Sequence, residues 1–555
     1  MTEKEIEGKE KFLRALERYE MLCYEKYAPY EGEIVYSPRH VKRMIRIIGN
    51  KPVITRSAVT AMAKYAAVFV IAAVTAVGTY VTVDAMQDEF FNVTEMPSSM
   101  PEYTLNAEKT EYTVTGIGSL AKGDITIPSS YNGIPVTAIG ERAFAGNGNI
   151  TSVTVSDGVT SIDVSAFENC DALESIVLPN SLAYIGAYAF SGCGSLTEIV
   201  LPESLEYIGS SAFAKCSEIS EIYIPSSVKS LGSSCFRSCY NVENIVFSEG
   251  IEVIGKNAFE DCTALEEINL PESLKTLGEG AFRSCTSLES VSFSAENVGA
   301  SAFENCENLK EISFFAENIG ENILKDCKSL EKVTLDGMEE IQEGMFNRCS
   351  NLTEVNIGDT VKRIGKHAFL YCTSLEYVVL PEGLECIEEF AFSFSGLVVL
   401  DLPDGLDDIR QNAFSGCASL REVKLPNELV VLEDEVFRGC QLLTKVEFGE
   451  KLKVIGFEAF FSCGWLREVS LPEGVEHIRQ RAFADCTMLR NVYLPASVRY
   501  IGHNVFVDCI RLKQIDFGGT VEEWESISIG INEEISVVCK DGVYMPGNKA
   551  KGREE

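Results

Sequence analysis

The sequence is poor in histidine, and it contains no residue pattern typical of a catalytic or metal site. Its four histidines are His40, His367, His477 and His503, and none has the spacing of a metal-binding motif such as HExxH. No serine or cysteine lies in a motif typical of a nucleophile. The stretch from Gly116 to Ser119 lacks the Gly-Lys-Ser/Thr that completes a phosphate-binding loop, so we interpret it as a turn. The sequence therefore predicts a protein that is not an enzyme and needs no cofactor or metal.

Basic residues are also scarce over most of the chain. Residues 1–83 contain 13 Lys and Arg against 9 Asp and Glu, whereas the remainder contains 35 against 74, a net charge of −39. An acidic body of this size repels polyanions, which excludes nucleic acid and anionic lipid headgroups as partners of that part of the chain. The simpler alternative, that the charge only keeps a long protein soluble, is compatible with the same composition.

Between Lys64 and Asp84 there is an uncharged stretch of 19 residues, from Tyr65 to Val83. This is close to the length that a helix needs to cross a bilayer. No acid occurs between Ile34 and Val83, basic residues crowd the upstream side, and acids follow from Asp84. Because basic flanks stay in the cytoplasm, residues 58–83 are predicted to form a transmembrane helix with the N-terminus inside and the rest outside. The alternative of a cleaved signal peptide is disfavoured, because the basic segment before the uncharged stretch is too long for an ordinary signal peptide. A buried soluble helix would need a covering that no nearby pattern supplies.

What the sequence does contain is a phenylalanine that returns every 21–23 residues. A period in this range is typical of a solenoid, whose units are too small to bury their own apolar faces and so stack on one another. The steps on either side of Phe303 and Leu324 are the shortest, and these units lack the proline of most others. The 17 repeat positions are Phe144, Phe167, Phe190, Phe213, Phe236, Phe259, Phe282, Phe303, Leu324, Phe346, Phe369, Phe392, Phe414, Phe437, Phe460, Phe483 and Phe506.

The unit from Leu173 to Ser195 shows what one coil is expected to contain. Ile176 faces inward and Val177 outward in a short strand, because successive strand residues alternate faces. A proline ends the strand, since it has no N–H for the ladder. An extended return path leads to Gly186, which is expected to adopt a positive φ in a turn. The residues around Phe190 then predict one short helical turn, so each coil is expected to combine a short parallel strand with a short helical turn.

These units follow the pattern LxxIxLPxxLxxIGxxAFxxC, which resembles the BspA-type leucine-rich repeat over about residues 103–545. The segment beginning YTVTGIGSLAKGDITIP resembles the usual opening unit of that family, and IDFGGTVEEWESISIG resembles its usual closing unit. The resemblance implies a leucine-rich repeat solenoid of about 17 coils, preceded here by the transmembrane helix. It also implies adhesion or protein binding at a cell surface, and no catalytic activity.

A column of cysteines accompanies the phenylalanines. Of the 19 cysteines, 15 lie three residues after a repeat position. Two units have Asn147 or Ser395 there, and since both share a small size and a polar tip with cysteine, the column is expected to hydrogen-bond the turn backbone. A zinc site is disfavoured because a straight row of cysteines cannot place four ligands at the corners of a tetrahedron. Disulfides are disfavoured because parallel side chains do not suit the torsion angle of the S–S bond. Redox sensing would need an exposed thiolate. We therefore predict buried free thiols. The ladder begins with Cys170, Cys193, Cys216, Cys239, Cys262 and Cys285.

Outward strand positions vary between units and form the candidate ligand-binding surface. Exposed apolar strips and aromatic residues are typical of interfaces, although β-branched and aromatic residues also simply stabilise strands. Phe315, in the short units, is expected beyond the strand Ile312–Phe314 and exposed in a notch, although neutral variation in turn length would also produce such units. The other candidate residues are Val177, Val200, Tyr223 and Val246 on the strands, with Tyr184 and Tyr207 on the adjoining return path.

The predicted order of parts is a cytoplasmic tail (1–57), the transmembrane helix (58–83), a flexible linker (84–102), the solenoid (103–517), a C-terminal cap (518–545) and a disordered tail (546–555). Residues 3–27 predict an amphipathic helix whose apolar face needs a partner, which could be the membrane surface or a second copy. The segment from Tyr36 to Gly49 and the residues around Asp84 are similar to the membrane anchors of anti-sigma-type regulators of Gram-positive bacteria.

Two main hypotheses follow for function. The first is a membrane-anchored surface module whose repeats bind an extracellular protein or the surface of a host or neighbouring cell. The second is a transmembrane sensor whose external repeats signal to a cytoplasmic partner of residues 1–33. A passive surface coat is the third.

Overall fold

The computed structural model describes residues 100–118, 121–335, 337–530 and 535–545. The predicted cytoplasmic tail, the transmembrane helix at 58–83, nearly all of the linker and the tail at 546–555 lie outside these residues. Within the described ranges, no helix combines the length and the apolar character that a membrane span requires.

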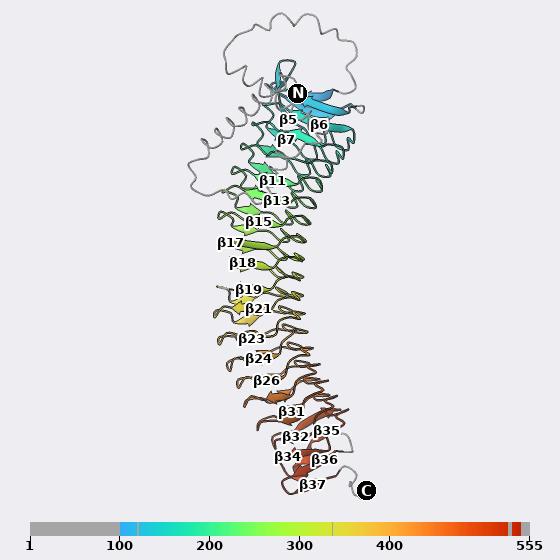
Figure 1. Cartoon of the computed structure of the whole chain (residues 1–555), viewed down its shortest axis with the longest axis vertical. Helices are drawn as coiled ribbons and strands as arrows, with labels where there is room; N and C mark the ends of the chain where they lie inside the picture. The colour runs from blue at the N-terminus through green and yellow to red at the C-terminus, as the bar shows by residue number, and fades with distance from the viewer. Residues whose placement is uncertain (1–99, 119–120, 336, 531–534, 546–555) are drawn as a thin grey trace, which may run out of the picture. The chain divides into compact units, whose positions relative to one another are not determined.

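The described residues wind into coils that stack one on the next (Figure 1). Each regular coil has an outer strand, a turn, a short return strand and a wide turn around the repeat phenylalanine. In the unit of Leu173, the outer strand is β8 (Ser175–Val177) and the return strand is β9 (Tyr184–Ile185). Their inward side chains, Ile176 and Ile185, are buried. The predicted alternation of inward and outward residues is therefore confirmed.

The strands form two parallel rows, with two antiparallel strands added at the N-terminal end and one at the C-terminal end. The outer row contains β3 (Gly123–Ile127), β6 (Ile150–Val155), β8, β11 (Glu221–Ile224), β13 (Asn244–Phe247), β15 (Glu267–Asn269), β17 (Ser290–Val298), β18 (Glu311–Ile319), β19 (Lys332–Leu335), β21 (Glu354–Ile357), β24 (Val399–Asp401), β26 (Glu422–Lys424), β28 (Lys445–Glu447), β30 (Glu468–Ser470), β32 (Asn491–Leu494), β34 (Gln514–Phe517) and β36 (Ser536–Cys539). The return row contains β2 (Tyr112–Ile117), β5 (Ile134–Ile139), β7 (Ser161–Ile162), β9, β10 (Tyr207–Ile208), β12 (Ser230–Leu231), β14 (Val253–Ile254), β16 (Thr276–Leu277), β20 (Glu340–Ile341), β22 (Arg363–Ile364), β23 (Cys386–Ile387), β25 (Asp408–Ile409), β27 (Val431–Leu432), β29 (Val454–Ile455), β31 (His477–Ile478), β33 (Tyr500–His503) and β35 (Ser528–Gly530). The antiparallel strands are β1 (Pro101–Leu105) on β2, β4 (Ser130–Tyr131) on β5 and β37 (Gly542–Tyr544) on β36.

Neighbouring outer strands pair in register at a distance of one repeat. Ser290 of β17 lies opposite Glu311 of β18, and Lys332 of β19 lies opposite Glu354 of β21. Because the register equals the repeat length, each residue lies beside its equivalent in the next coil. The period in the sequence thus becomes columns of equivalent side chains in space.

The core is a column of stacked phenylalanine rings. The ring centroids of Phe144 and Phe167 are 4.7 Å apart, and those of Phe483 and Phe506 are 5.7 Å apart, the two extremes of the repeat series. Neighbouring rings are within 15° of parallel. Leu324 interrupts the stack between Phe303 and Phe346 and is itself fully buried. Offset stacking of this kind adds to the free energy gained by burial.

The wide turn around each repeat phenylalanine is not the short helical turn that the sequence predicts. Within the described residues, the one α-helix is α4 (Val521–Ser526), in the C-terminal cap. In the unit of Phe167, alternate N–H groups donate to the next coil, as from Phe167 N to the carbonyl of Ala189 at 2.7 Å. Ser165 and Asn169 have φ of 56° and 58°, the left-handed region. The N–H groups between them donate within the turn, as from Glu168 N to the carbonyl of Ser165 at 3.1 Å. Bonds within the turn thus alternate with bonds between coils, and no continuous helical series forms.

Gly186 also has a different role from the predicted one, because its φ is not positive. A Cβ atom placed there would lie 2.7 Å from the backbone of Asp163 and Val164 in the preceding coil. At Gly209, the equivalent position of the next coil, the distance to Ala187 N would be 2.5 Å. The close approach of two coils therefore favours glycine at these two positions.

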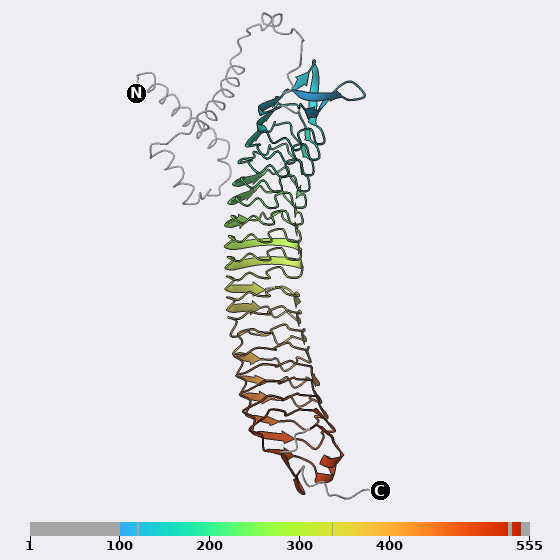
Figure 2. The ribbon, with the colours of Figure 1, turned by 90° about the vertical axis from the view of Figure 1, so that its right-hand side faces the viewer.

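The short units in the middle of the array contain two long strands. β17 and β18 each run through nine residues and appear side by side as long arrows (Figure 2). They replace the strand, turn and return strand of other coils, since the proline and its turn are missing. Phe315 lies inside β18, opposite Ser294 of β17, and not beyond the strand as the sequence predicts.

Candidate binding surface

Four of the predicted site residues form one apolar column on the outer row. Val177, Val200, Tyr223 and Val246 occupy the same outward position in successive coils and are between 44% and 64% exposed. Tyr223 lies opposite Val246 in the register of β11 and β13. We call these four residues the apolar column. Isolated exposed apolar residues are normal, but four in contiguous coils form a strip of the kind that binds partners.

The aromatic member of the apolar column is held in place by hydrogen bonds. The hydroxyl of Tyr223 donates to Glu203 Oε1 at 3.1 Å and accepts from Ser248 Oγ at 2.8 Å. The outward position two residues before the column carries an exposed acid in two of the four coils, Glu198 and Glu221. The column is therefore an apolar strip with a preorganised ring and an acidic margin.

The two tyrosines of the return path lie on another side of the coil. Tyr184 of β9 and Tyr207 of β10 stack with ring centroids 5.0 Å apart and an interplanar angle of 6°. They belong to the return row, which the turn beginning at Pro179 separates from the outer row. The structure thus places the six predicted residues in two groups on different rows.

An open hollow lies further along the outer row, on β15, β17, β18 and β19. Its volume is about 460 Å³. The inward side chains of these strands, such as Val291 and Ile312, are buried, so backbone forms the floor. The position that carries valine and tyrosine in the apolar column here carries small polar residues. These residues, which we call the polar row, are Asn269, Ser292, Ser313 and Thr334.

Sequence reasoning assigned no site to these four residues. The feature of the sequence that could have indicated the hollow is the small size of the outward residue in four consecutive units. These small residues form a hollow because the four units are in register. Phe315, which the sequence proposed as exposed, is 55% exposed on the same side of β18.

A second feature that the sequence reasoning missed is an aromatic pair on the wide turns. Tyr371 and Phe394 stack at 5.0 Å, and the guanidinium of Arg348 lies 5.7 Å from the Tyr371 ring centroid. Both aromatic residues have a left-handed φ, 61° and 56°, which is uncommon for bulky side chains. In most other units the equivalent residue is Asn, Asp, Ser or Gly, so the exception is visible in the sequence once the turn is known.

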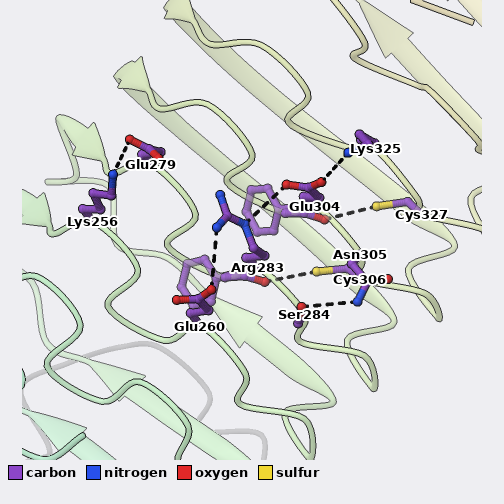
Figure 3. Close-up of polar contacts among 12 residues, drawn as sticks. Lys256, Glu260, Glu279, Arg283, Ser284, Glu304, Asn305, Cys306, Lys325 and Cys327 are labelled. Atoms are coloured by element: carbon purple, nitrogen blue, oxygen red, sulfur yellow. Dashed lines mark hydrogen bonds and ion pairs between the residues drawn. The ribbon is translucent and has the colours of Figure 1, made fainter.

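The cysteine column lies inside the wide turns. Cys306 and Cys327, which are labelled in Figure 3, donate from Sγ to the carbonyls of Phe282 and Phe303, each at 3.2 Å. All 15 cysteines of the column make the equivalent bond to the preceding coil, at 3.1 to 3.5 Å. The first six are Cys170, Cys193, Cys216, Cys239, Cys262 and Cys285. The column therefore joins successive coils through their backbone.

The chemistry of these thiols is that of inert side chains. The 18 cysteines within the described ranges are all buried and free of disulfides. Burial raises the pKa of Cys239 and of Cys306 to about 12. Since only the thiolate is a good nucleophile or metal ligand, Cys239 and Cys306 are poorly suited to either role at neutral pH. Among the described residues, no group of three or more His, Cys, Asp or Glu is placed to hold a metal ion.

Thiol labelling tests this arrangement. In the native full chain at pH 8, we expect Ellman's reagent to react quickly with at most one cysteine, Cys23, which lies outside the described residues. All 19 should react after unfolding in guanidinium, because unfolding exposes the buried thiols to the reagent. Rapid labelling of several cysteines in the native protein would contradict the buried column.

In five successive coils, from Arg237 to Lys325, an alternating column of charges runs beside the cysteines, one residue after the repeat position. Figure 3 shows Arg283 between Glu260 and Glu304, with Lys325 on the far side of Glu304. The Arg283–Glu304 and Lys325–Glu304 contacts are 3.3 Å and 2.8 Å, and Arg237 lies 2.9 Å from Glu260. The Glu260 side chain is only 10% exposed, so these pairs are screened less than ordinary surface pairs. We assign this column to the cohesion of the coils and not to binding.

Solved structures similar to this chain include a leucine-rich repeat protein from Bacteroides ovatus, with 26% identity, coverage of 81% of this chain and 100% of that chain, and a TM-score of 0.45. A leucine rich cell surface protein from Faecalibacterium prausnitzii is 23% identical, with coverage of 79% and 98% and a TM-score of 0.36. A leucine rich repeat protein from T. pallidum is 28% identical, with coverage of 43% and 91% and a TM-score of 0.30. No curated protein sequence matches the chain.

A family model described as the BspA type leucine rich repeat region matches five overlapping ranges, 137–265, 229–353, 296–421, 339–463 and 407–530. Together they cover well over half of the chain, and they include the apolar column and the polar row. Stacked coils, a repeat phenylalanine core and in-register parallel strands agree with a repeat of this kind. The chain therefore belongs to the family of BspA-type leucine-rich repeat proteins.

Proposed function

We propose that this chain is a membrane-anchored cell-surface protein whose repeats act as a non-catalytic module for protein binding or adhesion. The observation that carries the proposal is the apolar column, which exposes apolar groups on successive coils of a surface otherwise rich in acids. Repeat solenoids bind partners on such extended faces, because outward positions vary without disturbing the core. The uncharged segment within residues 58–83 would supply the anchor, with the repeats outside the cell.

The surroundings of the apolar column define the partner expected there. An apolar centre with an acidic margin fits a protein surface that has an apolar centre and basic residues around it. The hydrogen bonds that hold Tyr223 reduce the entropy lost on binding, which favours this residue as an energetic centre. The extracellular partner would therefore be a protein or a cell surface that presents basic and apolar side chains together.

Substitution of the apolar column tests the binding face. In the full chain expressed in its own cells, Val200→Lys with Val246→Lys should reduce the yield of a crosslinked extracellular partner about tenfold, since two apolar contacts at the centre of an interface are lost. Val379→Lys is the matched control, because Val379 is 62% exposed at the same outward position far from the column.

Both variants should fold, since each change is at an exposed, outward position. A double variant that captures the same partner as fully as the wild-type chain would show that the apolar column is not the binding face.

A transmembrane sensor is the second candidate function. It is favoured by the alternation of apolar and charged residues in the segment 3–27, which would present an apolar face to a cytoplasmic partner. The similarity of the segment Tyr36 to Gly49 to anchors of anti-sigma-type regulators points the same way. Deletion of residues 1–33 should then abolish signalling and leave adhesion intact, whereas a tailless chain that still signals would exclude the sensor.

A further inference from the structure

The polar row places hydrogen-bonding groups at regular intervals across four strands. Asn269 lies opposite Ser292, and Ser292 lies opposite Ser313, in the registers of β15, β17 and β18. Neighbouring strands lie about 4.8 Å apart, so the row offers an amide and three hydroxyls spaced along the direction of stacking. Each hydroxyl can donate one hydrogen bond and accept two, and the amide can do both as well.

Most of these groups are available to a ligand. Thr334 is the one member of the polar row with a side-chain hydrogen bond in the described part of the chain, and it accepts from Asn356 Nδ2 at 3.5 Å. The other three are exposed and make no such bond within the described residues. Water satisfies them in the free protein, and a ligand rich in hydroxyl groups could take the place of that water at little cost.

An exposed aromatic ring borders the polar row. Phe315 follows Ser313 by two residues on β18, so both side chains are on the same side of the strand. Its neighbours are small: Ser294 lies opposite it, and a Cβ atom on Gly337 would come within 3.4 Å of its ring. A phenylalanine with small neighbours leaves part of its ring open for stacking. A sugar ring has one face of C–H groups, which packs on an aromatic ring, and a rim of hydroxyls, which hydrogen-bond.

The charges around the hollow exclude other ligand classes. Glu267 and Glu311 border it, and the one cation among its lining residues, Lys332, pairs with Glu354 at 2.9 Å. Phosphate, nucleic acid and sulfated or acidic glycans would be repelled. An apolar protein segment would find few exposed apolar groups here apart from Phe315. The two carboxylates can instead accept hydrogen bonds from neutral hydroxyls, which complements the donors of an uncharged sugar.

We propose that the hollow on β15, β17, β18 and β19 binds a neutral carbohydrate chain. Sugar hydroxyls would bond to Asn269, Ser292 and Ser313, and one ring would stack on Phe315. The site begins one coil beyond the apolar column, where Asn269 lies opposite Val246, and it does not depend on the protein-binding function proposed for that column.

Calorimetric titration of the full chain in a mild detergent tests the site. The probes are linear oligosaccharides of glucose, mannose, galactose and xylose, with heparin as the polyanionic comparison. At least one neutral oligosaccharide should bind. Ser292→Val with Ser313→Val should weaken that binding about tenfold or more, because two hydroxyl partners are lost and the floor is filled. Phe315→Ala should weaken it by a similar factor through loss of ring stacking.

Ser470→Val is the matched control and should bind as the wild-type chain does. Ser470 has the same outward position on β30, and valine already occupies that position at Val177, Val200 and Val379, so the strands accept it. Failure of every neutral oligosaccharide to bind at millimolar concentration would overturn the proposal. So would binding of heparin in preference to them, or equal affinity in the wild-type chain and the Ser292→Val, Ser313→Val variant. Because Val200 and Val246 are intact in every variant, protein capture by the apolar column would be unaffected by any of these outcomes.

Discussion

Replacement of Phe259 by alanine is expected to destabilise the coils around it by about 3–5 kcal/mol, the cost typical of removing a buried aromatic ring. Phe259 is fully buried, and its ring stacks on Phe236 at 5.5 Å and on Phe282 at 5.3 Å. The ring of Phe247 also meets it edge to face at 5.8 Å. The substitution would thus leave a cavity bounded by three rings, and the backbone bonds between coils limit the collapse that could fill it.

The effect is best measured by hydrogen exchange of backbone amides in the full chain. Unfolding of a linear repeat array need not be two-state, so a single midpoint would average regions of different stability. Protection should fall mainly in the coils of Phe236, Phe259 and Phe282, since each coil contacts only its neighbours.

Phe315→Ala is the control for this change. It removes the same side chain from a site that is 55% exposed, and its expected cost is within about 0.5 kcal/mol. Equal costs for the two substitutions would refute a core built on the phenylalanine column.

Replacement of Gly255 by alanine is expected to cost about 1–3 kcal/mol, the range typical of overpacking. A Cβ atom at Gly255 would lie 2.6 Å from the carbonyl oxygen of Leu231 and 2.8 Å from the carbonyl carbon of Gly232. Both are backbone atoms, so the two coils must separate. Other units have a side chain at the equivalent position, such as Gln342, which shows that a coil can adjust its path. We therefore expect local strain and not global unfolding.

Gly148→Ala provides a control of opposite sign. No atom lies within 4 Å of a Cβ atom built on Gly148, and its φ is not in the left-handed region. Alanine there should be neutral or stabilising by up to about 1 kcal/mol, since it restricts the unfolded chain. Urea titration followed by circular dichroism should show different stabilities for the two variants. Hydrogen exchange of the backbone amides should show which coils are affected. A Gly255→Ala protein as stable as Gly148→Ala would show that the coils are less closely packed than described here.

The repeat period alone was sufficient to predict the architecture. A phenylalanine that returns every 21–23 residues can be buried in every unit only if the units stack in register, and the stacked rings confirm this. The residues of the apolar column were predicted to point outward, and all four do. A strand alternates faces whatever its neighbours are, so this prediction needs only the strand and its inward residues.

Two of the predictions that failed concern contacts between coils, and the third concerns where a strand ends. The turn around Phe190 has the composition of a helical turn, but its alternate N–H groups find carbonyl acceptors in the next coil. Gly186 suggested a positive φ, but the reason for glycine is the backbone of Asp163 and Val164 against it. Phe315 was expected beyond its strand, but without a proline to stop it β18 continues to Ile319. A local sequence pattern contains no information about the adjacent coil until the spacing between coils is known.

The candidate sites divide in the same way. The sequence by itself determined which side chains occupy each column, because the period fixes the register and alternation fixes the face. Only the tertiary structure decided which columns share a surface: it separated Tyr184 and Tyr207 from the apolar column, and it turned four small residues on β15, β17, β18 and β19 into a hollow beside Phe315. The physical reason is that the shape of a binding surface depends on the distance between neighbouring coils and on the relative sizes of their outward side chains. Stacking and close backbone packing determine this shape, and the sequence of a single repeat does not.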